Sequence, residues 1–365
     1  MKTNLQFFAV LIGLICSMTI HAQTTVTDGN WSNPETWGGV PPTGSGNVVI
    51  NHTVTLDIDY THIANSITIN ASGALNGNSS MRLFTLNYPN GTATMTVNGS
   101  FNIARTFLVS NTVNNNGIFQ SDSLLNSSDL TISPEATINT SQFMNNSEGT
   151  LNNNGTITSV DFLNIETVTN YGTITTNDFT NSKSFTNTSD GVLLITNDFS
   201  NIDTLASPAI FTNDGMVTVE NNWHNGNQVN GSGRFCISNN TWNSGSMSGT
   251  FDFCDLTGGE VDLNTGTISE TITYCLFSCL TEINELVDNS LISVFPNPAK
   301  THITISSEAT KTLTVEIFDL TGKLVTSAKI QTNEEFNISS LNSGVYLLKI
   351  TDEKRISFTN KLIKQ

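Results

Sequence analysis

Short alternations of apolar and polar residues recur through the middle of the chain. From about Thr96, each repeat joins a polar turn containing glycine to an alternating run, an Asn-Asp or Asn-Asn pair and an aromatic residue. Two clear copies are Asn154–Thr158, which leads to Phe162, and Tyr171–Thr175, which leads to Phe179. Successive side chains of a strand point to opposite faces, so Ile, Val and Leu would face inward while Thr and Ser face outward. The pattern predicts short β-strands joined by tight turns.

These turns repeat with a regular spacing. Their glycines recur at intervals of about 17 to 24 residues, once a degenerate repeat near Pro134 is allowed, at Gly99, Gly117, Gly155, Gly172, Gly191, Gly215 and Gly233. A period of about 20 in a β-rich chain is typical of a solenoid. The predicted fold class is all-β, with a right-handed parallel β-solenoid over residues 96–280. A β-sandwich of the same strands is the competing interpretation, although its turns would recur about every 8 to 12 residues.

Stacked coils predict two ladders of like side chains. An aromatic residue of each coil would stack on the next, in the order Phe162, Phe179, Phe199, Trp223 and Trp242. Asparagines at equivalent corners would form a second ladder of side-chain hydrogen bonds, as in other in-register assemblies. We also expect Asn and Gly to supply the positive-φ residues of the corners.

The N-terminal stretch has a different texture. Residues 28–42 contain Trp31, Trp37 and the run Gly38-Gly39-Val40-Pro41-Pro42, and alternating strands follow at residues 47–57. Over residues 27–75 the chain resembles G8-like modules, which precede β-helices in exported bacterial proteins. We expect residues 23–95 to form a cap, because an uncovered terminal coil would expose a strand edge.

The first residues predict export. Lys2, the apolar run Phe7–Ile15 and a cut before Gln23 are typical of a signal peptide over residues 1–22. Cys16 raises the alternative of a lipoprotein, although large residues precede it where a lipobox has small ones. No other stretch approaches the length of about 18 apolar residues that a membrane helix needs.

Composition supports a β-rich surface and disfavours two classes of protein. Charged residues make up 12% of the chain, with a net charge of -17, and 29 of the 48 asparagines lie between Asn98 and Asn243. Helix surfaces rely on Lys, Glu, Arg and Gln, so this composition disfavours an α-helical protein. It also disfavours nucleic acid as a partner, because phosphate binding needs clustered Lys and Arg.

The charge balance changes near Thr281. Residues 23–290 carry 4 basic and 24 acidic groups, whereas residues 291–365 carry 9 basic and 7 acidic groups. This shift predicts a linker at residues 281–290 and a separate domain at residues 291–365.

The last domain carries the most specific motifs. It opens on a Pro-Asn-Pro run, continues through two strand-turn-strand phrases and ends in a basic strand, and the motif residues are Pro296, Asn297, Pro298, Asp319, Gly322, Lys323, Gly344, Tyr346, Lys361 and Lys364. In this order the motifs resemble the type A C-terminal sorting domain of the type IX secretion system of Bacteroidetes. The resemblance implies an Ig-like β-sandwich that the outer-membrane translocon and its C-terminal signal peptidase recognise. It further implies a protein that is secreted or held on the outer-membrane surface, in some cases by linkage to lipopolysaccharide.

Four cysteines remain after the predicted signal peptide. Cys236, Cys254, Cys275 and Cys279 form an even set, which in an exported chain favours two disulfides with three pairings open. We expect Cys236 to pair with Cys254 and Cys275 with Cys279, because each pair closes a short loop. A zinc site is the weaker alternative, since no histidine lies nearby.

Candidate catalytic groups are sparse, and we predict no catalytic residues. Between residues 23 and 280 the basic side chains Arg82, Arg105, Lys183 and Arg234 are scattered. Carboxylates lie close in sequence at Asp57 with Asp59, Asp252 with Asp255, and Glu260 with Asp262. On a strand, residues two apart face the same way, so the first and third pairs could bind Ca²⁺ or act as acid and base. A solvated strand face is the alternative interpretation, and His52, His62 and His224 show no metal-ligand spacing.

The remaining candidates concern glycans. Trp223 and Trp242 could stack on sugar rings, although a tryptophan is more often a core residue. Ser123 and Thr204 each follow Asp and precede Leu, a pattern similar to O-glycosylation acceptors of this phylum. We therefore predict an exported, non-enzymatic protein that is adhesive or matrix-like. The alternative is a β-helix protein that binds or processes extracellular carbohydrate.

Overall fold

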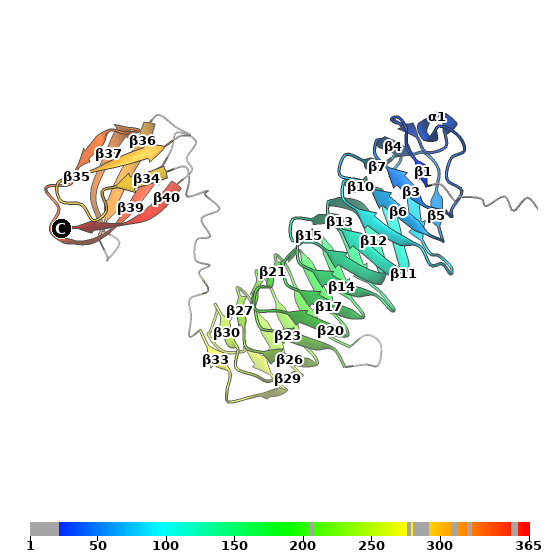
Figure 1. Cartoon of the computed structure of the whole chain (residues 1–365). Coiled ribbons are helices and arrows are strands. Elements are labelled where there is room, and N and C mark those ends of the chain that lie inside the picture. The colour runs from blue at the N-terminus through cyan, green and yellow to red at the C-terminus, as the bar shows by residue number, and fades with distance from the viewer. Residues whose placement is uncertain are drawn as a thin grey trace, which may run out of the picture. The chain divides into compact units, whose positions relative to one another are not determined.

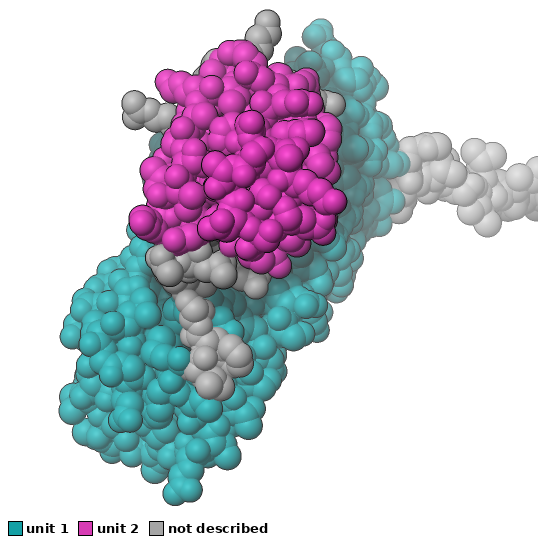
Figure 2. All heavy atoms as spheres, turned by 90° about the vertical axis from the view of Figure 1, so that its left-hand side faces the viewer, with its two compact units in different colours: residues 1–279 teal, residues 280–365 magenta. Residues whose placement is uncertain are grey.

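The computed structural model describes residues 22–203, 208–275, 279, 292–307, 312–319, 323–351 and 357–365. The chain divides into two compact units, residues 1–279 and 280–365, which Figure 1 shows as ribbons and Figure 2 colours separately. Both units consist of β-strands, and within the described ranges the helix is α1 (Pro34–Trp37). No helix in that part of the chain could cross a membrane. The predicted signal peptide and Cys16 lie outside the described residues.

The first unit is a parallel β-solenoid of about 12 turns, as predicted. Each full coil contributes one strand to each of three ladders, and strands of one ladder pair in parallel from coil to coil. The first ladder contains β1 (Gln23–Thr24), β3 (Val48–Ile50), β6 (Ser66–Ile69), β9 (Thr94–Val97), the end of β11 (Arg105–Asn115), the end of β12 (Ile118–Ile132), β14 (Thr150–Asn153), β17 (Thr167–Asn170), β20 (Ser184–Asn187), β23 (Ile210–Asn213), β26 (Gln228–Gly231), β29 (Ser246–Met247) and β32 (Thr267–Ile268).

The other two ladders complete the coils. The second contains β2 (Gly29–Asn30), β4 (Thr53–Leu56), β7 (Ala74–Gly77), β10 (Ser100–Asn102), the start of β12, the start of β13 (Thr137–Asn145), β15 (Thr156–Thr158), β18 (Thr173–Thr176), β21 (Val192–Ile195), β24 (Met216–Val219), β27 (Arg234–Ile237), β30 (Asp252–Asp255) and β33 (Thr273–Tyr274). The third contains β5 (Tyr60–His62), β8 (Leu83–Leu86), the start of β11, the middle of β12, the end of β13, β16 (Asp161–Asn164), β19 (Asp178–Asn181), β22 (Phe199–Asn201), β25 (Trp223–Asn225), β28 (Thr241–Asn243) and β31 (Leu263–Asn264). We call their outward sides the first, second and third faces.

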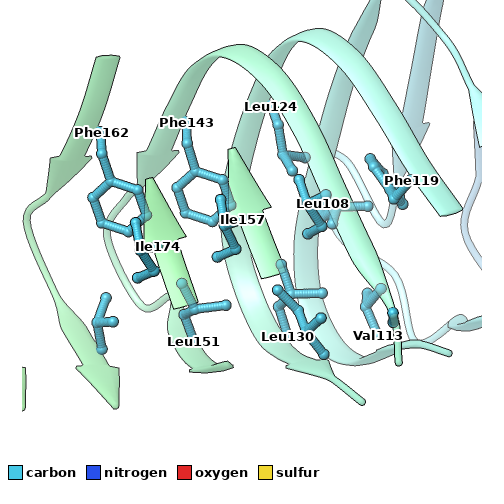
Figure 3. Close-up of a cluster of buried hydrophobic side chains, with 14 of the residues drawn as sticks. Leu108, Val113, Phe119, Leu124, Leu130, Phe143, Leu151, Ile157, Phe162 and Ile174 are labelled. Atoms are coloured by element: carbon cyan, nitrogen blue, oxygen red, sulfur yellow. The ribbon is translucent and has the colours of Figure 1, made fainter. Parts of the chain in front are cut away.

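Apolar side chains from all three ladders meet inside the coils. Figure 3 shows Val113 from the first ladder, Phe119 from the second and Leu108 from the third in one cluster, and all three are fully buried. Because every second side chain of each strand points inward, one continuous core runs along the coils. The solenoid thus buries its apolar residues without a second layer.

The aromatic ladder is present, with one correction. Phe162, Phe179, Phe199 and Trp223 stack with ring centroids 5.4 to 5.8 Å apart. Trp242 does not continue the row, because Thr241 is the residue in register with Trp223. Trp242 is instead in register with His224, which lies next to Trp223 on its strand and therefore faces outward. Its predicted place in the ladder is therefore wrong by one residue.

Asparagine side chains form two internal ladders, which confirms the second predicted ladder. In the longer one, each Nδ2 donates to the Oδ1 of the next coil at 2.8 or 2.9 Å, through Asn126, Asn145, Asn164, Asn181, Asn201, Asn225, Asn243 and Asn264. The shorter one runs through Asn153, Asn170, Asn187 and Asn213 at 2.7 to 2.9 Å. Buried amide groups need hydrogen-bond partners, and in each ladder the neighbouring asparagine side chains supply these partners to one another.

The turn glycines serve a different purpose from the one predicted. None of the seven repeat glycines has a positive φ. Instead, each turn lies against the backbone of the coil before it. A Cβ on Gly172 would lie 2.1 Å from the carbonyl oxygen of Gly155, and one on Gly215 would lie 2.2 Å from that of Gly191. Glycine is required because the coils approach too closely for a side chain.

The N-terminal region is already solenoid. Parallel coils begin at Gln23, not at residue 96, because β1 pairs with β3 and β3 with β6. Figure 1 shows α1 at this end of the unit. Trp31 and Trp37 are buried there, and the ring of Trp31 packs 4.3 Å from that of Tyr60, the start of an aromatic row. The cap and the G8-like resemblance stay predictions, and at this end the structure places two buried tryptophans and one helical turn.

His62 gives the solenoid a pH-dependent stability. It is fully buried, its Nδ1 lies 3.0 Å from the Tyr60 hydroxyl, and burial lowers its pKa from 6.5 to about 4. The unfolded chain therefore binds the proton more readily, so stability should fall as pH drops from about 6.5 towards about 4. Denaturant unfolding across that range should show that the free energy of unfolding changes less with pH in His62→Gln than in the unaltered chain. The half-buried His52 provides the control, and an equal loss of slope in His52→Gln would count against this assignment.

The second unit contains two antiparallel sheets. One has three strands, β34 (Ile292–Phe295), β35 (His302–Ser307) and β38 (Glu335–Asn337). The other has the order β37 (Leu324–Gln331), β36 (Thr312–Phe318), β39 (Gly344–Thr351) and β40 (Ser357–Lys364). Both sheets contribute to one core, with Ile303 and Ile305 from one and Val315, Ile317 and Leu348 from the other. This arrangement is compatible with the predicted Ig-like sandwich.

Candidate functional site

The Pro-Asn-Pro motif holds the last strand in place. Asn297 Nδ2 donates to the carbonyl of Lys361 at 2.6 Å, and the Ile363 amide donates to Asn297 Oδ1 at 2.9 Å. Ala299, just after the motif, continues the pairing: its amide donates to Ile363 O and its carbonyl accepts from the Gln365 amide, both at 2.8 Å. The side chain of Asn297, between its two flanking prolines, therefore pairs with the backbone of β40 as a neighbouring strand would.

The other motif residues shape turns and strand ends. The Lys323 amide donates to Asp319 Oδ1 at 3.1 Å, while the Asp319 amide donates to Lys323 O at 3.0 Å, which closes that turn. Gly344 begins β39, and the Tyr346 hydroxyl donates to Asn342 O at 2.9 Å. The side chain of Lys361 is exposed, and Lys364 is half-buried. Gly322 lies outside the described residues.

The disulfides are present, but the preferred pairing is wrong. Cys236 bonds to Cys279, and Cys254 bonds to Cys275. Cys254 and Cys275 lie 21 residues apart, about one coil, so stacking makes them neighbours. Pairing by the shortest loop failed although Cys236 and Cys254 are in register on β27 and β30, because each of them bonds to a cysteine that follows β33. Both bonds tie the last coils together.

One groove lies along the second face near its C-terminal end. It has a volume of about 420 Å³, and its lining includes Asp190, Asp214, Arg234 and Asp252. Arg234 is in register with Asp252, and Asp214 accepts hydrogen bonds from the Ser232 amide and hydroxyl at 2.9 and 2.8 Å. Three carboxylates with one guanidinium make this groove acidic. Sequence analysis missed Asp190 and Asp214, because residues 24 apart become neighbours only through coil stacking.

A second groove lies on the third face and is mainly apolar. Phe107, Leu125, Met144 and Leu163 follow one another in register on successive coils and line a space of about 390 Å³. Ser123 and Asp161 also line it, two residues before Leu125 and Leu163. Ser123 is thus placed on the third face, while Thr204 lies outside the described residues.

The same outward row ends in an aromatic pair. The ring of Trp242 stacks on that of His224, with centroids 4.3 Å apart and planes 15° apart. Trp242 is 45% exposed, and burial lowers the pKa of His224. Leu263 follows Trp242 in register and is also exposed. The row therefore presents a flat aromatic surface to solvent.

Trp223 cannot contact a glycan, contrary to the sequence prediction. It is 1% exposed and packs between Phe199 and Phe253 inside the coils. Trp223 and Asn225 both face inward on β25, and His224 between them faces outward. The prediction failed because a shift of one position along the strand decides whether a tryptophan faces inward or outward.

The two carboxylate pairs expected to share a strand face, Asp57 with Asp59 and Glu260 with Asp262, do not lie on strands. Asp57 and Asp59 follow β4 and bind different partners: Asp57 accepts from the Ser32 amide and hydroxyl, whereas Asp59 pairs with Arg82 at 3.1 Å. Burial would raise the pKa of Asp57, but the hydrogen bonds from Ser32 outweigh it and lower that pKa. Hydrogen bonding from the Leu83 amide, helped by Arg82, lowers the pKa of Asp59.

The other carboxylates meet around one threonine that sequence analysis missed. The Thr241 hydroxyl donates to Asp255 Oδ2 at 2.6 Å, and the Thr241 amide donates to Asp262 Oδ2 at 2.9 Å. Asp252, predicted as the partner of Asp255, instead accepts from the Thr273 hydroxyl at 2.9 Å. Glu260 lines a separate hollow at the end of the coils. Within the described ranges, no cluster of three His, Cys, Asp or Glu side chains is placed to hold a metal ion.

The scattered basic residues bind their own scaffold. Lys183 pairs with Glu166 at 2.5 Å, and Arg105 donates to the carbonyl of Met81 at 2.7 Å. His52 Nδ1 lies 3.0 Å from the Thr25 hydroxyl. Coil stacking explains these contacts, since each partner lies about one coil away.

Comparison with known proteins places most of the second unit in a known domain family. Residues 293–365 match the family model described as the secretion system C-terminal sorting domain. The chain is also 34% identical over 74 residues to an endo-acting ulvan lyase of Formosa agariphila, a match that covers 20% of this chain and 14% of that enzyme. The chain thus spans about one seventh of that enzyme's length.

The family match and the motif geometry agree. The Pro-Asn-Pro motif with its hydrogen bonds to the last strand, the turn from Asp319 to Lys323 and the basic last strand all fall within the matched residues. The chain therefore carries a type IX secretion C-terminal sorting domain at residues 293–365.

Proposed function

We propose that the solenoid is the cargo of this export route and acts outside the cell as a non-enzymatic adhesive or matrix protein. The proposal rests on one observation, the uniform polar row of the first face. Thr or Asn occupies one outward position on nine successive coils, namely Thr68, Thr96, Asn114, Thr131, Asn152, Thr169, Thr186, Thr212 and Asn230.

This row suits a repetitive hydrogen-bonding partner. Parallel strands lie about 4.8 Å apart, so hydroxyl and amide groups recur at that interval along the face. Each contact is weak because it replaces a hydrogen bond to water. Many contacts made by one rigid surface add up by multivalency. Extracellular glycans, including surface lipopolysaccharide, offer such repeated hydroxyl groups, and the sorting domain itself would meet the translocon and the C-terminal signal peptidase.

The second candidate is carbohydrate binding on the third face. Its support is the apolar groove from Phe107 to Leu163 together with the exposed Trp242 ring. Apolar and aromatic surfaces bind the C–H faces of sugar rings, and Asp161 or Ser123 beside them could bind hydroxyl groups. Since the passenger carries 24 acidic and 4 basic groups over residues 23–290, a neutral polysaccharide suits it better than a sulfated one.

One experiment distinguishes the two faces. The purified full chain is sedimented with microcrystalline cellulose, chitin or cross-linked agarose, and the bound fraction is measured. Thr169→Lys with Thr186→Lys places two charges in the polar row of the first face. Thr180→Lys with Ser200→Lys places the same charges at outward positions of the third face. Binding by the first face predicts about a tenfold loss for the first variant only, equivalent to about 1.4 kcal/mol.

The opposite pattern would favour the carbohydrate-binding groove. Equal binding by both variants and the unaltered chain would reject both faces. Release of soluble sugars during the incubation would contradict the non-enzymatic proposal directly.

A further inference from the structure

The outward side of the four-stranded sheet is divided into two halves. Towards one end it carries polar side chains, including Thr314, Lys329 and Thr351, and an ion pair between Lys349 and Glu316 at 3.6 Å. Towards the other end the same alternating positions are apolar. They are Phe318, Leu324, Val345, Leu347 and Ile363, which we call the apolar patch.

The apolar patch crosses all four strands. Phe318 on β36 is in register with Leu324 on β37 and with Leu347 on β39, and Val345 is in register with Ile363 on β40. Leu324 is 47% exposed, Leu347 46% and Val345 37%. Single exposed apolar residues are common, but a contiguous group on one sheet face indicates an interaction surface.

Lysines border the apolar patch. Lys361 is in register with Leu347 and is exposed, and the exposed Lys323 directly precedes Leu324. The nearby carboxylates are engaged, because Asp319 accepts from the Lys323 amide in its own turn and Glu316 pairs with Lys349. The surface therefore has an apolar centre and a mainly basic edge.

Sorting-motif residues from four parts of the sequence border this one surface. The Asp319 to Lys323 turn leads into Leu324, the strand that begins at Gly344 carries Val345 and Leu347, and the basic end carries Ile363. Asn297 holds that end in place through its hydrogen bonds to Lys361 O and the Ile363 amide. A shared surface explains why residues so far apart in sequence belong to one signal.

We propose that the apolar patch is the surface by which the sorting domain docks on the type IX secretion machinery. The partner surface is an apolar hollow bordered by carboxylates. Burial of Leu347, Val345 and their neighbours supplies affinity, because apolar centres dominate interface energy. Lys323 and Lys361 orient the encounter by charge complementarity.

The test measures export of the full chain in a bacterium with a working type IX system. Cells are fractionated, and immunoblotting gives the share of protein outside the cell and in the periplasm. Val345→Thr with Leu347→Thr should lower the exported share about tenfold or more, because both substitutions remove apolar area that docking would bury. Threonine retains β-propensity at both positions.

Ser327→Thr with Lys329→Thr is the matched control, because both residues face outward in the polar half of the same sheet. Thermal unfolding and limited proteolysis of each purified chain report whether the domain stays folded. If the double variant unfolds, Leu324→Thr on β37 decides the question with the same readout. Export of a folded patch variant at the unaltered level, or an equal loss in the control, would overturn the proposal.

Discussion

Replacement of Asn153 by alanine is expected to destabilise the solenoid by about 4 kcal/mol, because two buried groups and one part-buried carbonyl would lose this partner at about 1 to 3 kcal/mol each. The side chain of Asn153 donates to Asn170 Oδ1 at 2.7 Å and to the carbonyl of Thr173 at 3.3 Å, and it accepts from the Gly155 amide at 3.2 Å. Water cannot replace it, since Asn153 is fully buried. Urea unfolding followed by far-UV circular dichroism measures the change.

The neighbouring residue supplies the control. Asn152 lies on the same strand, faces outward and is exposed. Asn152→Ala should change the free energy of unfolding by no more than about 0.5 kcal/mol. A similar loss in both variants would show that asparagine matters here for strand propensity and not for the internal ladder.

A methyl group on Gly172 is expected to disrupt the coil at its turn. Its Cβ would lie 2.1 Å from the carbonyl oxygen of Gly155, a backbone atom that cannot move without shifting the preceding coil. Overpacking of this kind costs about 3 kcal/mol or more. Thermal unfolding of Gly172→Ala should therefore show a markedly lower Tm for the solenoid.

Gly39 provides a matched control for that change. No atom lies within 4 Å of a Cβ built there, and its φ is not positive. Gly39→Ala should leave the Tm unchanged or raise it slightly, because alanine restricts the unfolded chain. A Gly172→Ala chain as stable as the Gly39→Ala chain would show that the coils separate more easily than their spacing indicates.

The solenoid could be predicted from sequence because every coil repeats the same local pattern. Alternation fixed which residues face inward, and the recurring glycine gave the period. The asparagine that recurs on the third ladder from Asn126 to Asn264 also sets the register, and it locates the error at Trp242. Trp223 lies two positions before Asn225, whereas Trp242 lies one position before Asn243, so the two tryptophans face opposite sides.

Contacts between coils could not be predicted in the same way. The partners of Asp255 and the acidic groove around Asp214 depend on which residues stack, and irregular turns change that spacing from coil to coil. Stacking alone does not give the cysteine pairing either, because Cys236 bonds to Cys279 and not to Cys254, with which it is in register. The start of the solenoid was missed although Gly73 continues the row of turn glycines before Gly99, because these two glycines lie 26 residues apart, outside the spacing of the later repeats.

The sorting domain shows the same division. Its motifs identified the family, since Pro296, Asn297 and Pro298 occur in a fixed order with the later turns. The apolar patch was not visible, because alternation on β39 gives Val345 and Leu347 no neighbours until the strand order is known. Strand order is a tertiary property that local pattern does not specify.

Export through the sorting domain is tested most directly by removing it. In a bacterium with a working type IX system, the full chain and a chain lacking residues 293–365 are expressed at equal levels and located by cell fractionation and immunoblotting. The full chain should be found outside the cell or on its surface, and the shortened chain should be retained in the periplasm as a protease-resistant solenoid. Recovery of the shortened chain outside the cell in the same proportion as the full chain would contradict the central claim.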